Sequence, residues 1–339
     1  MSTSSPSRRR IVAFALLLAG CVAVAVVALV AGAKSGGSKA KATAGAANVL
    51  PAAKAKGEPM VVYTVDDGHR RGSGQVAIAP LATPNEHRTL TSLACDRVYF
   101  SAAGAGICLA RRGGFAAGYE AKMFGPDLKV RHTLPLDGIP SRTRVSPDGR
   151  YAATTLFVTG DSYADAGSFS TRTTIIDLKT GRTVANLEDF VVLRGQRRIT
   201  AIDVNFWGVT FARDSDRFFA TVATGGKTYL IEGSVRAREA HVIQENVECP
   251  SLSPDGTRIA FKKRTDSNDT PWHLTVLDLA TMRETPLTEQ RSVDDQVEWL
   301  DDKNVLYGVD GAIWTARADG TGEPTRFIDH ASSPAVVRY

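Results

Sequence analysis

The sequence lacks the compact motifs that mark common catalytic and metal sites. It contains no Gly-x-Ser-x-Gly elbow of a serine hydrolase, and Gly104 and Gly106 have no third glycine or following helix, so they indicate a turn. None of the six histidines has a zinc-type spacing to cysteine or a carboxylate. They are His69, His87, His132, His241, His273 and His330. We therefore predict no catalytic residue, no metal and no cofactor.

Acidic residues are absent from residues 1–57, which carry eight lysines and arginines. This stretch has a net charge of +8 while the whole chain has +5, which leaves −3 for residues 58–339. The basic character therefore belongs to the N-terminal part. Because the remainder is mildly acidic, a surface that follows nucleic-acid phosphates is not expected there.

Charge is also absent from Ile11 to Ala33, a run dominated by alanine, valine and leucine. As a helix it would be about 34 Å long, enough to cross a hydrocarbon core of about 30 Å. We predict a transmembrane helix at 11–33, a cytoplasmic N-terminus at 1–10 and a flexible linker at 34–58, which has no apolar period. The bulk of the chain would then be extracytoplasmic, held at the cell membrane by a single-pass signal-anchor.

Leu18-Ala19-Gly20-Cys21 offers a second form of attachment, because it resembles the lipobox in which a cysteine is acylated after cleavage. The residues after Cys21 stay apolar where a lipoprotein normally turns polar. Chance placement in an Ala/Leu-rich helix is the alternative interpretation.

A repeat organises the rest of the chain. Ser146-Pro147-Asp148-Gly149 and Ser253-Pro254-Asp255-Gly256 each precede a short strand pattern and then a second strand that ends in Asp-Leu before a Thr-containing turn. Proline and glycine at these positions favour a tight hairpin turn. A repeated unit of four short strands indicates radially packed copies, since one unit alone cannot bury both its faces.

The strand count suggests how the repeats close. Only three strands, near Met60–Val65, Gln75–Ala79 and His87–Leu93, precede the second unit, and one surplus strand, Ser333–Val337, follows the sixth. Pairing of the surplus strand with the first three would complete unit one and protect the sheet edges. We predict an all-β fold over 59–339, a six-bladed β-propeller whose C-terminal strand closes the first blade.

The Ser-Pro-Asp-Gly-x-x-Ile-Ala-Phe pattern, followed by Leu-Asp-Leu, resembles the repeat of TolB-type six-bladed β-propellers. The part from about Pro59 to Tyr339 is similar to membrane-anchored TolB-like proteins of high-GC Gram-positive bacteria. The resemblance implies an extracytoplasmic propeller used for protein contact. In TolB the propeller follows a separate α/β domain, whereas this chain has the predicted span and linker there, so a role in the Tol system does not follow.

Two cysteines are candidates for a disulfide. Cys95 and Cys108 fall on the two arms of one predicted hairpin. A turn centred near Ser101 and Ala102 would make them cross-strand neighbours within disulfide reach, and a turn centred nearer Ala103 would leave them diagonal. Two buried thiols are the alternative, and Cys249 is expected to be an unpaired core residue.

The long middle loop of the third unit is the candidate binding site. Asp161, Tyr163 and Phe169 lie in it, and long loops between short-looped repeats often carry recognition. An ordinary packed insertion explains the loop equally well. The acidic pairs Asp66-Asp67, Asp294-Asp295 and Asp301-Asp302 lack calcium-loop spacing and are expected to be turns.

These features favour a non-enzymatic, membrane-anchored scaffold that binds a protein or peptide. The alternative is a propeller enzyme, a lyase or hydrolase, with His and Asp residues that converge on the central channel. An extracytoplasmic sensor is a third interpretation, in which signalling would need a partner within the membrane, because ten residues precede the span.

Overall fold

The computed structural model describes residues 45–66, 74–113, 118–158 and 170–339. The predicted cytoplasmic segment 1–10 and membrane span 11–33 lie outside these residues. Within the part that the structure describes, no helix has both the length and the apolar character needed to cross a membrane.

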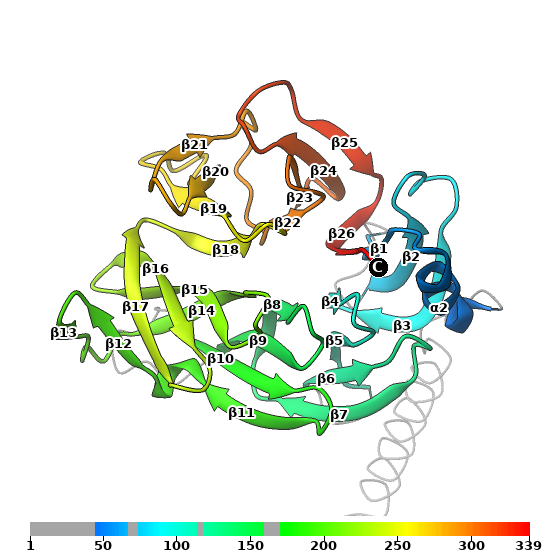
Figure 1. The fold of residues 1–339 in the computed structure, drawn as a ribbon, viewed down its shortest axis with the longest axis horizontal. Coiled ribbons are helices and arrows are strands. Elements are labelled where there is room, and N and C mark those ends of the chain that lie inside the picture. Colours follow the sequence, from blue (N-terminus) through cyan, green and yellow to red (C-terminus); the bar gives the residue numbers. More distant parts are fainter. Residues whose placement is uncertain (1–44, 67–73, 114–117, 159–169) are drawn as a thin grey trace, which may run out of the picture. The chain divides into compact units, whose positions relative to one another are not determined.

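The described strands form six sheets arranged around a central axis, and each sheet is one blade of a β-propeller (Figure 1). Blade 1 contains β26 (Ala331–Val337), β1 (Met60–Val65), β2 (Gly74–Pro80) and β3 (Thr89–Cys95), from the axis outward. Blade 2 contains β4 (Arg97–Phe100), β5 (Gly106–Arg111), β6 (Tyr119–Phe124) and β7 (Val130–Leu136). Blade 3 contains β8 (Ile139–Val145), β9 (Tyr151–Val158), β10 (Ser170–Asp177) and β11 (Arg182–Asn186), followed by the 3-10 turn η1 (Leu187–Asp189).

The remaining blades follow the same order. Blade 4 contains β14 (Asn205–Phe211), β15 (Arg217–Thr224), β16 (Lys227–Ser234) and β17 (Glu239–Glu245). Blade 5 contains β18 (Glu248–Leu252), β19 (Arg258–Arg264), β20 (Trp272–Asp278) and β21 (Glu284–Pro286). Blade 6 contains β22 (Glu298–Trp299), β23 (Asn304–Val309), β24 (Ala312–Arg317) and β25 (Thr325–Ile328).

Blade 4 is larger than the repeat predicts. The basic connector before it forms β12 (Val191–Arg194) and β13 (Arg197–Arg198), which add two strands to its outer edge. β12 runs parallel to β17, with Val192 opposite Ala240. Because this pairing joins segments distant in sequence, no local hairpin signal announces it.

The ring closes as the strand count predicts. β26 pairs antiparallel with β1, with Val337 opposite Met60 and Ala335 opposite Val62. The hydroxyl of Thr64 donates a hydrogen bond of 3.0 Å to the carbonyl of Ser332 across the same pair. The last strand of the chain is therefore the innermost strand of blade 1.

The core is distributed between the blades. Among the described residues the buried apolar side chains form six clusters, and each occupies the space between two neighbouring sheets. The cluster between blades 3 and 4, for example, packs Ile175 of β10 against Phe206 and Phe218 of blade 4. Each sheet thus buries both faces only because it has a neighbour on each side.

The Ser-Pro-Asp-Gly turns form as predicted. Gly149 and Gly256 have φ of +73° and +75°, and the amide of each donates to the carbonyl of the turn's serine at 2.9 Å. Asp255 accepts hydrogen bonds from the amide and hydroxyl of Thr257, at 3.0 and 2.8 Å, and one from the hydroxyl of Ser253. The aspartate therefore holds the turn together as an ionised acceptor.

These turns should make the propeller sensitive to acid. Burial alone would raise the pKa of Asp255 and of Asp148, but hydrogen bonds from Ser253 and Thr257, and from Ser146 and Arg150, hold both below the ordinary range. A carboxylate with a lowered folded-state pKa contributes stability above its unfolded pKa and loses it as the pH falls. We expect the urea midpoint to decrease from about pH 5 downward.

The double variant Asp148→Asn/Asp255→Asn tests this origin. It should be less stable than the wild type at pH 7, and its midpoint should fall less on acidification to pH 4. If the urea midpoint of this variant falls between pH 7 and pH 4 by as much as that of the wild type, the explanation is contradicted.

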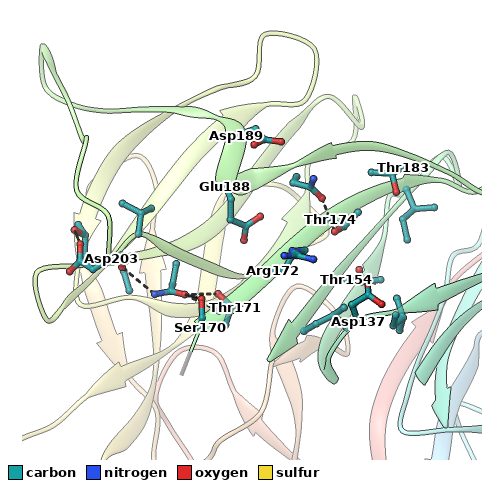
Figure 2. Close-up of a pocket in the computed structure, with 18 of the residues that line it drawn as sticks. Asp137, Thr154, Ser170, Thr171, Arg172, Thr174, Thr183, Glu188, Asp189 and Asp203 are labelled. Carbon is teal, nitrogen blue, oxygen red and sulfur yellow. Dashed lines mark hydrogen bonds between the residues drawn. The ribbon is translucent and has the colours of Figure 1, made fainter. Parts of the chain in front are cut away.

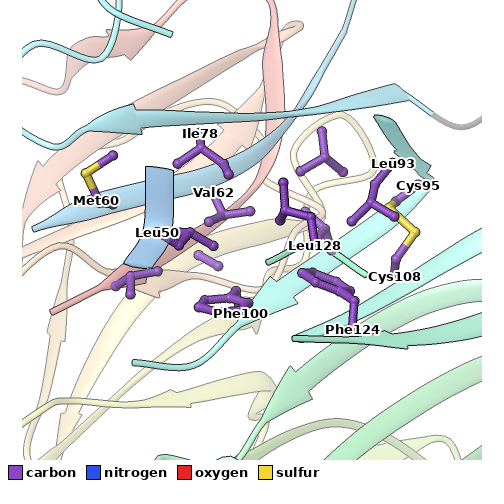
Figure 3. Packing of buried hydrophobic residues seen from close by; sticks show 14 of the residues in the cluster. Leu50, Met60, Val62, Ile78, Leu93, Cys95, Phe100, Cys108, Phe124 and Leu128 are labelled. Atoms are coloured by element: carbon purple, nitrogen blue, oxygen red, sulfur yellow. A yellow bond between two sulfur atoms is a disulfide. The ribbon is translucent and has the colours of Figure 1, made fainter. Parts of the chain in front are cut away.

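The disulfide joins Cys95 and Cys108, with an S–S distance of 2.05 Å and a Cα separation of 5.4 Å (Figure 3). The two cysteines do not lie on the arms of one hairpin, however. Cys95 ends β3, the outer strand of blade 1, and Cys108 lies on β5 of blade 2, opposite Val98. The bond therefore links two blades, and a loop of this length stabilises a fold by about 3 kcal/mol.

The segment predicted as a linker at 34–58 contains a helix. α2 (Ala46–Lys56) lies between Gly45 and Gly57, which both have positive φ. Alanine has the highest helix propensity, and Leu50 is 1% exposed in the cluster between blades 1 and 2 (Figure 3). Small side chains that read as a solvated linker thus form one buried helix face, and the linker prediction is wrong for these residues.

Candidate functional site: the central pocket

A pocket of about 550 Å³ opens on the axis of the ring, at the end where the Ser-Pro-Asp-Gly turns lie. The inner strand of every blade contributes to its wall. The contributing residues are Tyr99, Arg144, Thr210, Ser251, Glu298 and Val336. The pocket is therefore a product of the closed ring.

An ion pair crosses the axis within this pocket. Arg144 of blade 3 and Glu298 of blade 6 lie 2.8 Å apart, and their side chains are 7% and 8% exposed. Blades 3 and 6 are opposite each other in a ring of six, so this contact spans the channel. A buried pair of this kind is stable only when other hydrogen bonds satisfy the remaining polar atoms.

Those hydrogen bonds come from three further blades. The hydroxyl of Tyr99 lies 3.2 and 3.3 Å from the carboxylate oxygens of Glu298, and the amide of Val336 donates to Glu298 at 3.2 Å. Arg144 donates to the hydroxyl of Ser251 at 3.4 Å and to the carbonyl of Val297. Burial, together with the charge of Glu298, raises the pKa of Tyr99, so this phenol is a neutral donor.

A second polar layer lies at the other end of the inner strands. Asp294 accepts from Arg142 at 3.0 Å and from Lys262 at 2.6 Å. The side chain of Asp294 is 59% exposed, and partial desolvation by its neighbours opposes its ionisation, but the cations Lys262, Arg142 and Arg97 lower its pKa overall. Gln296 donates to the carbonyls of Val209 and Pro250. The channel is thus bridged at two levels, and a ligand would bind at the mouth of the pocket instead of passing through.

The mouth is lined by arginines, with aromatic side chains buried behind them in the wall. Of the residues that the structure describes, four arginines line the pocket against two acids, Asp255 and Glu298. The four arginines are Arg144, Arg213, Arg217 and Arg338. Arg213 and Arg338 are exposed, while Trp299 and Phe211 are buried in the wall. Arginine and aromatic side chains are the residues that most often carry the energy of protein contacts.

The structure describes only some of the residues that the sequence suggested for a site. Asp161, Tyr163 and Phe169 lie outside the described residues. Among the described histidines, His132, His241 and His273 fall in blades 2, 4 and 5 and are not brought together. No group of three or more metal-ligating side chains is found among the residues that the structure describes.

Sequence reasoning missed the ion pair and its partners. Arg144 and Glu298 stand in short strands, the first of them two residues before a Ser-Pro-Asp-Gly turn and the second immediately before Trp299. A charged residue inside a short buried strand was the available signal, because such residues are seldom fully buried unless paired. Which residues pair across the ring depends on which blades are opposite each other and on how deep each side chain lies in the channel.

No family model matches the chain, and no curated protein sequence matches it. Solved structures do resemble it. TolB from Acinetobacter baumannii is 16% identical at a TM-score of 0.55, over 82% of this chain and 66% of that one, so the chain spans just under two thirds of that protein.

A nidogen/laminin complex contains a chain 9% identical at a TM-score of 0.55, covering 82% of this chain and 98% of that one. A puromycin-hydrolysing peptidase from Mycobacterium tuberculosis is 12% identical at a TM-score of 0.48, over 80% and 43% of the two chains. At these identities the likeness concerns the fold, which is that of a TolB-like six-bladed β-propeller.

Proposed function

We propose that this TolB-like propeller is a non-enzymatic scaffold that binds a protein or peptide partner at the mouth of its central pocket. The observation that carries the proposal is the Arg144–Glu298 pair, which spans the ring beneath a mouth lined by exposed arginines. The charges of Arg144 and Glu298 neutralise each other. The hydroxyl of Tyr99 and the amide of Val336 donate further hydrogen bonds to the Glu298 carboxylate. An ion pair whose groups are already neutralised and hydrogen-bonded suits the base of a binding site better than a catalytic site.

The charge of the mouth indicates the kind of partner. Arg213 and Arg338 are exposed there, and the lining arginines outnumber the acids. Complementary charge raises association rates and rejects partners of the wrong sign. The segment that enters the pocket is therefore acidic, either a run of Asp and Glu or a chain end with its carboxylate.

The solved relatives support a binding role. One chain of this fold belongs to a nidogen/laminin complex, which is an assembly of proteins. The TolB match shows the same ring in a second protein. Neither protein identifies the partner of this chain.

The proposal places the scaffold outside the cytoplasm, tethered to the cell membrane by residues 11–33. The uncharged length of that segment and the Cys95–Cys108 bond, which an oxidising compartment would maintain, support this placement.

A site-specific photo-crosslinker tests the proposal in cells that make the protein. Placed at Arg213 or Arg338, the probe should give one discrete adduct with another protein. A probe at Arg326, an exposed arginine of blade 6 on β25, is the matched control and should give none.

Charge reversal supplies the second arm. With the probe at Arg338, the substitution Arg213→Glu should reduce the adduct at least about tenfold, because it removes one favourable charge contact and adds a repulsive one. Adducts of equal yield at all three probe positions, or no adduct at Arg213 and Arg338, would refute binding at this mouth.

A further inference from the structure

A second concavity lies away from the axis, along the outer edge of blade 3. It has a volume of about 960 Å³, and Figure 2 shows the side chains that line it. One side reaches the end of β7 in blade 2, and the other reaches the start of β14 in blade 4. We call it the blade 3 groove. It shares no lining residue with the central pocket.

The groove exists because β11 is short. β11 pairs with residues Thr174 to Asp177 of β10 and leaves the start of β10 without an outer strand. Side chains replace that strand: Asn205 accepts from the amide of Thr171, and Glu188 accepts from the amide of Thr173, both at 2.8 Å. The sheet edge is thereby blocked against another β-strand.

The charge of the groove is opposite to that of the central pocket. Among the described residues, four carboxylates line it against one guanidinium, a formal charge of −3. They are Asp137, Glu188, Asp189 and Asp203, with Arg172 as the cation. Asp203 is committed to a turn, where it accepts from Thr224 and Gly225, each at 2.7 Å.

Glu188 and Asp189 retain free acceptor capacity. Only one oxygen of Glu188 receives a hydrogen bond from another described residue, and Asp189 accepts none from the described part of the chain. Figure 2 shows the carboxylate of Glu188 directed into the groove, with Arg172 beyond it.

An unpartnered hydroxyl marks the same groove independently. Thr154 of β9 lines the wall and is 1% exposed, and its Oγ has no hydrogen-bond partner in the described structure. Buried hydroxyls are nearly always hydrogen-bonded, so an orphaned one in the wall of a cavity indicates a missing partner. In Figure 2, Arg172 lies between Glu188 and Thr154. A ligand that reaches both Glu188 and Thr154 must therefore be elongated.

We propose that the blade 3 groove binds an extended basic peptide segment, with a lysine or arginine side chain on Glu188 and a polar group on Thr154. The carboxylates supply the charge for the cation, and the length of the groove admits several residues. This site is separate from the one proposed above, and either can fail alone.

The titration of Glu188 gives the site a pH signature. Glu188 is exposed at its surface, but the protein atoms crowded around its carboxylate desolvate it and raise its pKa to about 7, with Arg172 on β10 opposing the shift and Asp189 adding to it. Asp203, before β14, is the other carboxylate on this side. A bound cation favours the ionised carboxylate, so affinity should fall as the pH decreases from 8 to 6 and binding at pH 7 should release a proton.

Calorimetric titration of the full chain with acetyl-Lys-Lys-Lys-amide tests the proposal, with acetyl-Gln-Gln-Gln-amide as the neutral control peptide. Glu188→Gln should reduce the affinity for the tri-lysine peptide at least about tenfold, since it removes a charge-assisted hydrogen bond. The glutamine oxygen can still accept from Thr173, so the fold is retained. Glu245→Gln, an equal charge change outside the groove, should leave affinity unchanged.

Thr154→Val separates ligand binding from a structural role. The isosteric change removes the orphaned hydroxyl, so it should raise the urea midpoint while weakening the tri-lysine peptide several-fold. The proposal is overturned if the wild type does not bind tri-lysine, if it binds tri-glutamine equally well, or if Glu188→Gln binds tri-lysine as the wild type does.

Discussion

Deletion of residues 331–339 is expected to abolish the cooperative unfolding of the propeller. These residues contain β26, whose Ala331, Ala335 and Val337 are fully buried. Ala335 and Val337 fill the cluster between blades 1 and 2, and Ala331 fills the one between blades 6 and 1. The deletion also exposes the whole inner edge of β1.

The expected loss is about 5 kcal/mol or more, comparable with the total stability of many domains. Circular dichroism during urea denaturation should show a broad, shifted transition or none. Deletion of residues 338–339 alone is the matched control for stability, since it leaves β26 intact and removes Arg338 from the pocket mouth and the hydrogen bond from Tyr339 to the Leu50 carbonyl.

A complementation experiment distinguishes loss of closure from general damage. A synthetic peptide of residues 331–339, added to the truncated protein, should restore the transition in a concentration-dependent way. A truncated protein that unfolds with the wild-type midpoint would show that closure by β26 contributes little.

The substitution Glu298→Ala should cost about 3–5 kcal/mol, because it leaves the Arg144 guanidinium buried without its counter-charge. Tyr99 and Val336 would lose their acceptor as well. Urea denaturation at pH 7 measures the loss. The control is Glu232→Ala, which breaks the exposed pair with Arg217 and should cost less than about 1 kcal/mol.

Replacement of both partners tests the cause. Arg144→Met/Glu298→Leu removes the pair without leaving a buried charge, and it should recover most of the stability lost in Glu298→Ala. If the double variant is as unstable as Glu298→Ala, the loss comes from packing or from the hydrogen bonds of Tyr99 and Val336.

The architecture could be predicted because its signals are local. Ser-Pro-Asp-Gly specifies a turn by the backbone preferences of its own residues, and the surplus strand near Ala335 follows from counting. The disulfide pair was identified but misplaced, because β3 extends to Cys95 and the blade boundary falls after it.

The site could not be predicted in the same way. The contact between Arg144 and Glu298 depends on which blades are opposite and how deep each side chain lies, and neither is written in the local pattern. α2 and the β12–β17 pairing share this property, because tertiary contacts decide both. The groove at Glu188 results from a strand that ends early.

The covalent connections between the strands, including the disulfide between blades 1 and 2, determine where the ring can break. Blade 1 is fixed to blade 2 by Cys95–Cys108, and the chain runs from β25 of blade 6 directly into β26, so it is the pairing of β26 with β1 that closes the ring without a covalent bond. Thermal breathing, or tension applied through the N-terminal end, would therefore open the ring within blade 1, between β26 and β1. The opened form would be a C-shaped clamp in which β1, β2 and β3 stay fixed to blade 2 by the disulfide, while β26 stays with blade 6.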